Sequence, residues 1–178
     1  LRDELGLIKN AMETEKISES IEDTNNVVIV PAFVGLGAPH WNSDCSGFIT
    51  GLTRGSNKKH IIRAALESIA YQVNDLLECI KKDFSKSINK LNVDGGATQN
   101  NFLMQFQADI SRTIIVKPKN IETTAIGVGF MAGLQSEFWN SSKDIFNERL
   151  IDNYYKPKMK SKDRLIKINQ WKEALKRI

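Results

Sequence analysis

The chain has 178 residues, of which 41% are apolar and 26% charged, and its formal net charge is +4. Glycine contributes 11 residues and proline 4, so the composition excludes collagen-like, low-complexity and wholly disordered proteins. The length suits one large domain or two small ones, with enough residues to bury a core. No apolar run approaches the roughly 18 residues of a membrane-spanning helix, so we expect a cytoplasmic protein with no membrane partner.

The first residues carry a helical pattern. Leu1, Leu5 and Ile8 lie at helical spacing, with neither a Met nor a capping residue before them. This pattern predicts a helix over residues 1–23 that is entered partway. We therefore expect the chain to be a piece of a longer polypeptide, with catalytic groups outside it.

The middle of the chain contains the longest predicted helix. Apolar residues repeat at steps of four and three from Ile62 to Ile80, which predicts a core helix over 57–82 that Ser56 or Asn57 can cap. The other expected elements are strands at 27–30, 47–52, 88–93 and 113–116, and helices at 99–111 and 123–137.

The order of these elements indicates the fold class. Strand, helix, strand and helix follow one another with short links after residue 86, which favours an α/β domain with at least one parallel strand pair. The helix at 123–137 is apolar nearly all round, so we expect it to be buried. Gly129 and Gly133 share one of its faces, and we interpret them as sites of close packing against a neighbouring element.

Residues 26–140 contain no linker-like stretch and form the expected core, with 141–178 as a helical and basic extension. Cys45 and Cys79 have no partner at metal-ligand spacing, so the sequence supports neither a disulfide framework nor a metal site. We expect both thiols to be buried.

The cations gather in the tail. Residues 156–178 carry nine Lys or Arg against Asp163 and Glu173, a local charge of +7 that leaves −3 for the rest of the chain. Apolar residues recur at helical spacing from Leu165 to Trp171, so the tail also reads as an amphipathic helix. We interpret it as a docking helix; a patch for nucleic acid or acidic membrane is the alternative.

A glycine turn carries the strongest chemical signal. Asp94, Gly95 and Gly96 lie between a predicted strand and a predicted helix, where free backbone N–H groups favour a phosphate or polar ligand. Adjacent glycines leave a flat main-chain surface, and Asn100, about one turn into the helix, offers both a donor and an acceptor. The structural alternative is that the glycines only form the turn. Asp94 is placed to act near a nucleotide and its Mg²⁺, and the alternative is that it only stabilises the turn. His40 and His60 lack a nucleophile or carboxylate at motif spacing, so we expect structural or surface roles for both.

Long blocks of this sequence resemble the C-terminal half of the FGGY carbohydrate kinases. The stretch 47–67 satisfies the second signature of that family. The residues at 51–55 and 68–72 resemble those of its glycerol kinases more than those of its xylulose or gluconate kinases. One departure is His40, which stands where a Tyr is usual. The matching blocks are VPAF at 30–33, GLGAPHW at 35–41, GLTRG at 51–55, HIIRAALESIAYQ at 60–72, VDGG at 93–96 and NNFLMQFQ at 100–107.

This resemblance implies a ribonuclease-H-like domain of the actin and hexokinase type, the second of two in the enzyme. It implies that Gly96 and Asn100 contact ATP or ADP, with Gly95 in the same turn, and that the whole enzyme uses Mg²⁺ to phosphorylate glycerol. The family's general base, phosphate loop and glycerol contacts have no counterpart here, so no catalytic residue is assigned and the chain alone is expected to be inactive.

Two other readings stay open at the level of sequence. The chain could belong to a kinase of another polyol or sugar within the same family, which residues outside the chain would decide. It could also be a noncatalytic binding module that uses the basic tail. The resemblance further implies a homo-oligomeric enzyme without nucleic acid as a partner. The Lys-rich stretch 156–160 differs from bacterial relatives in the region that meets a regulatory partner, so we do not expect control by that partner.

Overall fold

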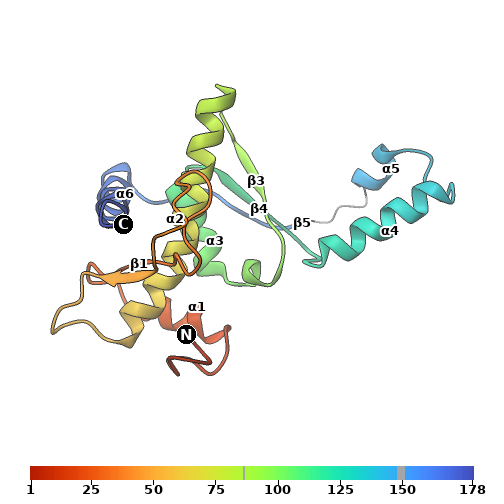
Figure 1. Ribbon diagram of the computed structural model, residues 1–178. Coiled ribbons are helices and arrows are strands. Elements are labelled where there is room, and N and C mark those ends of the chain that lie inside the picture. The colour runs from red at the N-terminus through yellow and green to blue at the C-terminus, as the bar shows by residue number, and fades with distance from the viewer. Residues whose placement is uncertain (86, 148–150) are drawn as a thin grey trace.

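The computed structural model describes residues 1–85, 87–147 and 151–178. Helices α2 and α3 lie at the centre, a small sheet and α1 lie near the N-terminus, and α6 lies along one side (Figure 1). The helices and strands are α1 (Glu13–Glu19), β1 (Val28–Val30), β2 (Phe48–Thr50), α2 (Lys58–Phe84), β3 (Lys90–Asn92), the 3₁₀ helix η1 (Gly96–Gln99), α3 (Asn101–Ser111), β4 (Ile114–Pro118), α4 (Thr123–Gln135), α5 (Ser142–Asn147), β5 (Ile151–Tyr155) and α6 (Ser161–Leu175).

The N-terminal helix is shorter than its apolar spacing predicted. Helix α1 begins at Glu13, and the residues before it form turns, so the prediction of a helix from residue 1 was wrong. Gly6 has a φ of +58°, in the left-handed region that a right-handed helix cannot continue through. Leu5 is 59% exposed, so the apolar pattern there has no face to pack against.

The strands form two small sheets. β1 pairs with β2 in antiparallel fashion, while β3 runs parallel to β4 and β5 is antiparallel to β4. The parallel pair that the strand–helix order predicted is confirmed. β5 was not predicted, because only its last residue, Tyr155, is buried and the strand carries no alternating apolar pattern.

Helix α2 buries a different face from the one that its apolar residues marked. Ile62 and Leu66 are buried as expected, but Ile69 and Leu76 are more than 40% exposed. The buried face of α2 instead includes polar residues beside the apolar ones: Arg63, Glu67, Ser68, Ala70, Tyr71, Asn74 and Leu77.

A capping box closes the N-terminus of α2. In it the Asn57 side chain accepts from the backbone N–H of Lys59.

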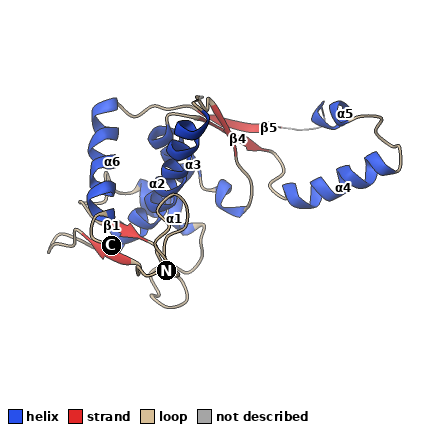
Figure 2. Cartoon of the chain, turned by 45° about the horizontal axis from the view of Figure 1, so that its top comes forward, coloured by secondary structure: helices blue, strands red, loops and turns tan. Residues whose placement is uncertain are grey.

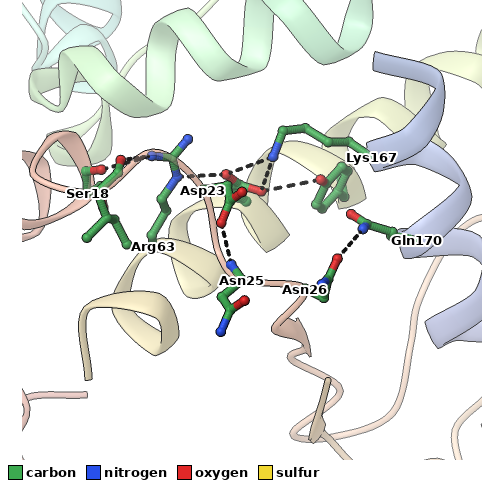
Figure 3. Close-up of polar contacts among 10 residues, drawn as sticks. Ser18, Asp23, Asn25, Asn26, Arg63, Lys167 and Gln170 are labelled. Atoms are coloured by element: carbon green, nitrogen blue, oxygen red, sulfur yellow. Dashed lines mark hydrogen bonds and ion pairs between the residues drawn. The ribbon is translucent and has the colours of Figure 1, made fainter. Parts of the chain in front are cut away.

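A buried ionic group, which we call the Glu67 cluster, ties three helices together (Figure 3). Glu67 on α2 accepts from Arg63 Nε at 3.0 Å and pairs with Lys167 Nζ of α6 at 3.4 Å. Arg63 Nη1 in turn donates to the carbonyl oxygens of Ser18 and Ile21 at the end of α1. Positive charge at a helix C-terminus is favourable, so Arg63 holds α1 against α2.

The tail helix docks into the core, as the sequence predicted. Trp171 of α6 is 0% exposed, and its ring stacks on Tyr71 with centroids 5.2 Å apart. Its Nε1 donates to Asp75 Oδ2 at 2.7 Å. Burial, together with the carboxylate of Glu67, raises the pKa of Tyr71 well above its ordinary value of 10.0.

Helices α4 and α5 extend away from the rest of the chain beyond the end of the β3–β4–β5 sheet (Figures 1 and 2). The prediction that the helix at 123–137 is buried was wrong for this chain: no residue of α4 is buried, and Met131 is 73% exposed. A Cβ on Gly133 would overlap the Trp139 ring, whereas one on Gly129 would meet no atom within 4 Å. Close packing at a glycine therefore occurs at one of the two expected positions.

Candidate functional site

The glycine turn follows β3 directly. The Val93 N–H donates to the Val116 carbonyl at 3.2 Å and extends the parallel pairing by one residue. Gly95 then has a φ of +81°, and its N–H donates to the Ile121 carbonyl at 3.2 Å. Only glycine adopts this backbone conformation without strain, so the strand ends in the tight turn that the sequence predicted.

The turn leaves an open main-chain surface. Residues Gly96–Gln99 form η1, and both the N–H and the hydroxyl of Thr98 donate to the Gly95 carbonyl, at 3.1 and 2.7 Å. A Cβ built on Gly95 or Gly96 would meet no atom within 4 Å. Because the backbone is exposed there, a planar or polar ligand can approach it closely.

Asn100 is the N-cap residue of α3, so the expectation that it lies about one turn into a helix is corrected. Its Oδ1 accepts from the Leu103 N–H at 2.9 Å, and its Nδ2 donates to Thr14 Oγ1 at 3.0 Å. An amide has two N–H donors and two acceptor lone pairs, so these bonds leave it capacity for a ligand. Asn100 adjoins the open turn through the short helix η1.

Two residues from distant parts of the sequence, Glu15 and Tyr155, contact Asn101, which follows Asn100 in this site. The Glu15 carboxylate accepts from both the backbone N–H and the Nδ2 of Asn101, and the Tyr155 hydroxyl donates to Asn101 Oδ1 at 2.5 Å. Glu15 lies 86 positions before Asn101, and Tyr155 lies 54 positions after it. Such separations follow no local period, so single-sequence patterns do not reveal them.

Asp94 links the turn to the start of α4. Its exposed carboxylate accepts a hydrogen bond from the hydroxyl of Thr123, the first residue of α4. This contact agrees with the turn-stabilising alternative. The described ranges contain no group of three His, Cys, Asp or Glu side chains that could hold a metal ion.

Both histidines have structural partners. His60 Nδ1 accepts from the Asn57 N–H at 3.1 Å within the capping box of α2. His40 Nε2 lies 3.1 Å from Asp75 Oδ2, the atom that also accepts from Trp171. Both contacts agree with the structural or surface roles expected for the two histidines.

A pocket of about 360 Å³ lies between the 31–40 loop and α2, away from the glycine turn. Its lining combines apolar residues and glycines with His40 and Gln72, and it contains none of the predicted site residues. Cys45 and Cys79 are free and half-buried, so the expectation that both thiols are buried was wrong. Across residues 1–85, 87–147 and 151–178, none of the helices combines the length and the apolarity that crossing a bilayer requires.

The fold is shared with solved kinases. Glycerol kinase of Plasmodium falciparum, solved with ADP, superposes with a TM-score of 0.88 at 37% identity, over 97% of this chain and 34% of that one. Xylulose kinase of Lactobacillus acidophilus superposes with a TM-score of 0.76 at 21% identity, over 93% of this chain and 34% of that one, which shows the fold alone. The chain is thus a ribonuclease-H-like α/β domain of the actin and hexokinase type.

The sequence identifies the family. Residues 2–136 match the C-terminal domain of the FGGY family of carbohydrate kinases, and the chain belongs to that family. It is 50% identical over 177 residues to the glycerol kinase of Shewanella piezotolerans, which covers 99% of this chain and 36% of the relative. The glycerol kinase of Aeromonas hydrophila is also 50% identical, over 99% of this chain and 35% of the relative. The chain therefore spans about a third of the length of these relatives.

Proposed function

We propose that the chain is the nucleotide-binding domain of an ATP-dependent glycerol kinase, which converts ATP and glycerol to ADP and glycerol 3-phosphate. The observation that carries the proposal is the open turn at Gly95 and Gly96, at the C-terminal end of a parallel strand and before α3. Ligands of α/β sheets bind at such strand ends. The glycerol kinase neighbour with ADP and the relatives at about 50% identity support the same reading.

The site residues keep the roles that the resemblance implied. The adenosine end of ATP lies on the flat backbone of Gly95 and Gly96, and Asn100 adds a hydrogen bond from its amide. In the reaction the γ-phosphorus forms a bond to a glycerol oxygen and its bond to the bridging β-phosphate oxygen breaks, while a base takes the hydroxyl proton. No described residue of this chain is assigned as that base, so we expect the chain alone to leave glycerol unphosphorylated.

The described residues do not form a preorganised Mg²⁺ site of their own. The Asp94 carboxylate at the turn accepts from Thr123, and the described part of the chain contains no group of three His, Cys, Asp or Glu side chains that could hold the ion. A Mg²⁺ ion that arrives with ATP takes most of its ligands from phosphate oxygens and water, which is its usual preference. We also propose that the enzyme works in the cytoplasm as a homo-oligomer, with ATP and glycerol as its partners.

The alternatives are weaker on particular observations. Trp171 and Ile168 bury the apolar face of α6 in the core, which favours a docking role for the tail over a separate binding module. A kinase for another polyol or sugar of the same family would share this fold. The identity of about 50% to glycerol kinases favours glycerol.

The test uses a hybrid enzyme in which this chain replaces the matching C-terminal part of the Shewanella piezotolerans glycerol kinase. We expect the hybrid to phosphorylate glycerol with ATP and to prefer it over xylulose and gluconate. Gly96→Ala adds a methyl group to open surface, so we expect a normal melting temperature but a KM for ATP raised about tenfold, which corresponds to roughly 1.4 kcal/mol.

The matched control is Gly37→Ala, which also adds a methyl group where no atom lies within 4 Å, but far from the turn in sequence. It is expected to leave the KM for ATP and the KM for glycerol unchanged. Asn100→Ala is expected to raise the KM for ATP more than the KM for glycerol. If Gly96→Ala and Asn100→Ala both leave the KM for ATP at the wild-type value, the nucleotide lies elsewhere and the proposal is wrong.

A further inference from the structure

Helix α1 lies beneath the start of α3 and contacts it through two neighbouring side chains. Thr14 accepts from Asn100 Nδ2 at 3.0 Å, and Glu15 accepts from the backbone N–H of Asn101 at 3.1 Å and from its Nδ2 at 2.8 Å. The resemblance assigned no role to α1. The contacts join two segments 86 positions apart at the end of the glycine turn.

We propose that Thr14 and Glu15 are positioning residues for the nucleotide, which act through Asn100 and Asn101 without touching the ligand. The proposal rests on the proposed function, because it requires that Asn100 bind ATP or ADP. It adds to that function a reason why the amide of Asn100 presents one fixed orientation.

The first step concerns the orientation of the Asn100 amide. The Thr14 hydroxyl donates to the Ala11 carbonyl at 2.6 Å, so its lone pairs are left to accept from Asn100 Nδ2. The helix cap requires Asn100 Oδ1 to face the Leu103 N–H. The two bonds select the same orientation, because rotation of the amide by 180° would place a donor against the Leu103 N–H and an acceptor against the lone pairs of Thr14 Oγ1. Thr14 is 5% exposed, so water does not replace it freely.

The second step concerns the backbone of the first turn of α3. The N–H groups at a helix start have no partner within the helix, and a carboxylate there is favourable. The Glu15 carboxylate supplies a hydrogen-bond partner and a negative charge at this helix start. Its Oε2 accepts from the Asn101 N–H, and its Oε1 accepts from the Asn101 side-chain amide. Tyr155 holds the opposite side of that amide. Asn101 is thus fixed from α1 and from β5, and the backbone of Asn100 beside it is fixed as well.

The third step is that α1 itself is anchored. Arg63 is 9% exposed and donates to the Ser18 and Ile21 carbonyls, while its guanidinium lies 4.9 Å from the centroid of the Phe102 ring on α3. One buried cation therefore contacts α1 and α3 at once. A helix held in this way can transmit the positions of Thr14 and Glu15 to the glycine turn.

The experiment measures the KM for ATP and kcat in the hybrid enzyme. Thr14→Val keeps the shape of the side chain but removes the acceptor, and Glu15→Gln keeps the shape but removes one of two acceptors. We expect each to raise the KM for ATP three- to tenfold with kcat within a factor of two, and the double variant to raise it further. Thr14→Ser retains the hydroxyl and is expected to restore the wild-type KM.

The matched control is Glu19→Gln, because Glu19 lies on the same helix and is exposed. A merely structural role for Thr14 and Glu15 would lower kcat through loss of folded enzyme and leave the KM for ATP unchanged, and that result would overturn the inference. If Thr14→Val does not fold, Glu15→Gln alone decides the question.

The failures of the two proposals are distinguishable. If Asn100→Ala and Gly96→Ala raise the KM for ATP while Thr14→Val and Glu15→Gln do not, the positioning role is refuted and the nucleotide site stands. If Asn100→Ala leaves that KM unchanged, the positioning role fails with the assignment of Asn100.

Discussion

Replacing Trp171 tests whether α6 is a true part of the core. The side chain is 0% exposed, stacks on Tyr71 at 5.2 Å with an interplanar angle of 13°, and donates to Asp75 at 2.7 Å. Trp171→Ala leaves a cavity at that position, and such truncations cost about 3–5 kcal/mol. Domains unfold with about 5–15 kcal/mol in total, so this single change would remove a large share of the stability.

A second variant separates packing from hydrogen bonding. Trp171→Phe keeps an aromatic ring beside Tyr71 but loses the bond to Asp75 and some volume, so we expect a cost of about 1–2 kcal/mol. The assay is urea unfolding followed by far-ultraviolet circular dichroism, because removal of a tryptophan alters the fluorescence signal itself.

Trp41→Ala is the matched control, because Trp41 is 79% exposed. We expect it to change the free energy of unfolding by no more than about 0.5 kcal/mol. If Trp171→Ala costs no more than Trp41→Ala, α6 does not pack on α2 as described, and the docking role of the tail is refuted.

Three further substitutions probe separate parts of the fold. Burial and Glu67 raise the pKa of Tyr71, so Tyr71 contributes stability below about pH 10 that is lost as the pH rises toward the folded-state pKa. The free energy of unfolding should therefore fall less between about pH 9 and 11 in Tyr71→Phe than in wild type. Equal slopes in the two proteins would contradict the burial of this hydroxyl. Gly51→Ala should cost about 2 kcal/mol or more in urea unfolding, because Gly51 has a φ of +80° and a Cβ there would overlap backbone atoms. Gly37→Ala should be near neutral in the same assay. Similar costs for the two variants would refute this explanation. Asn57→Ala should cost about 1 kcal/mol in the same assay by removing the cap of α2, and a wild-type midpoint would show that the cap contributes nothing.

The sequence predicted the elements better than their faces. Ile62 to Ile80 marked α2 because a helix imposes its own period, yet the buried face of α2 is turned toward Arg63 and Glu67. A count of apolar residues does not include the Arg63–Glu67 ion pair of α2, whose further partners come from α1 and the residues after it and from α6. The same limit explains α4, whose apolar residues predicted burial although this chain places none of them in the core.

The candidate site was predictable only where it is local. Adjacent glycines after a strand indicate a tight turn by themselves, and Gly95 does adopt a positive φ. Asn100 was expected inside the helix because its role as an N-cap depends on where the turn ends, which η1 shifts. Thr14 and Glu15 reach the site from another part of the chain, so their roles follow from tertiary structure alone.

The pairing of β5 with β4 has a consequence for how the chain responds to cutting. The chain leaves the sheet at Pro118 and rejoins it at Ile151, its partner in the register, so the excursion that includes α4 begins and ends at one point. Exposed excursions of this kind are preferred sites of proteolytic nicking. After such a nick the C-terminal part would remain attached through the ladder and through Trp171. The two pieces are therefore expected to elute as one particle on a sizing column and to separate only in denaturant.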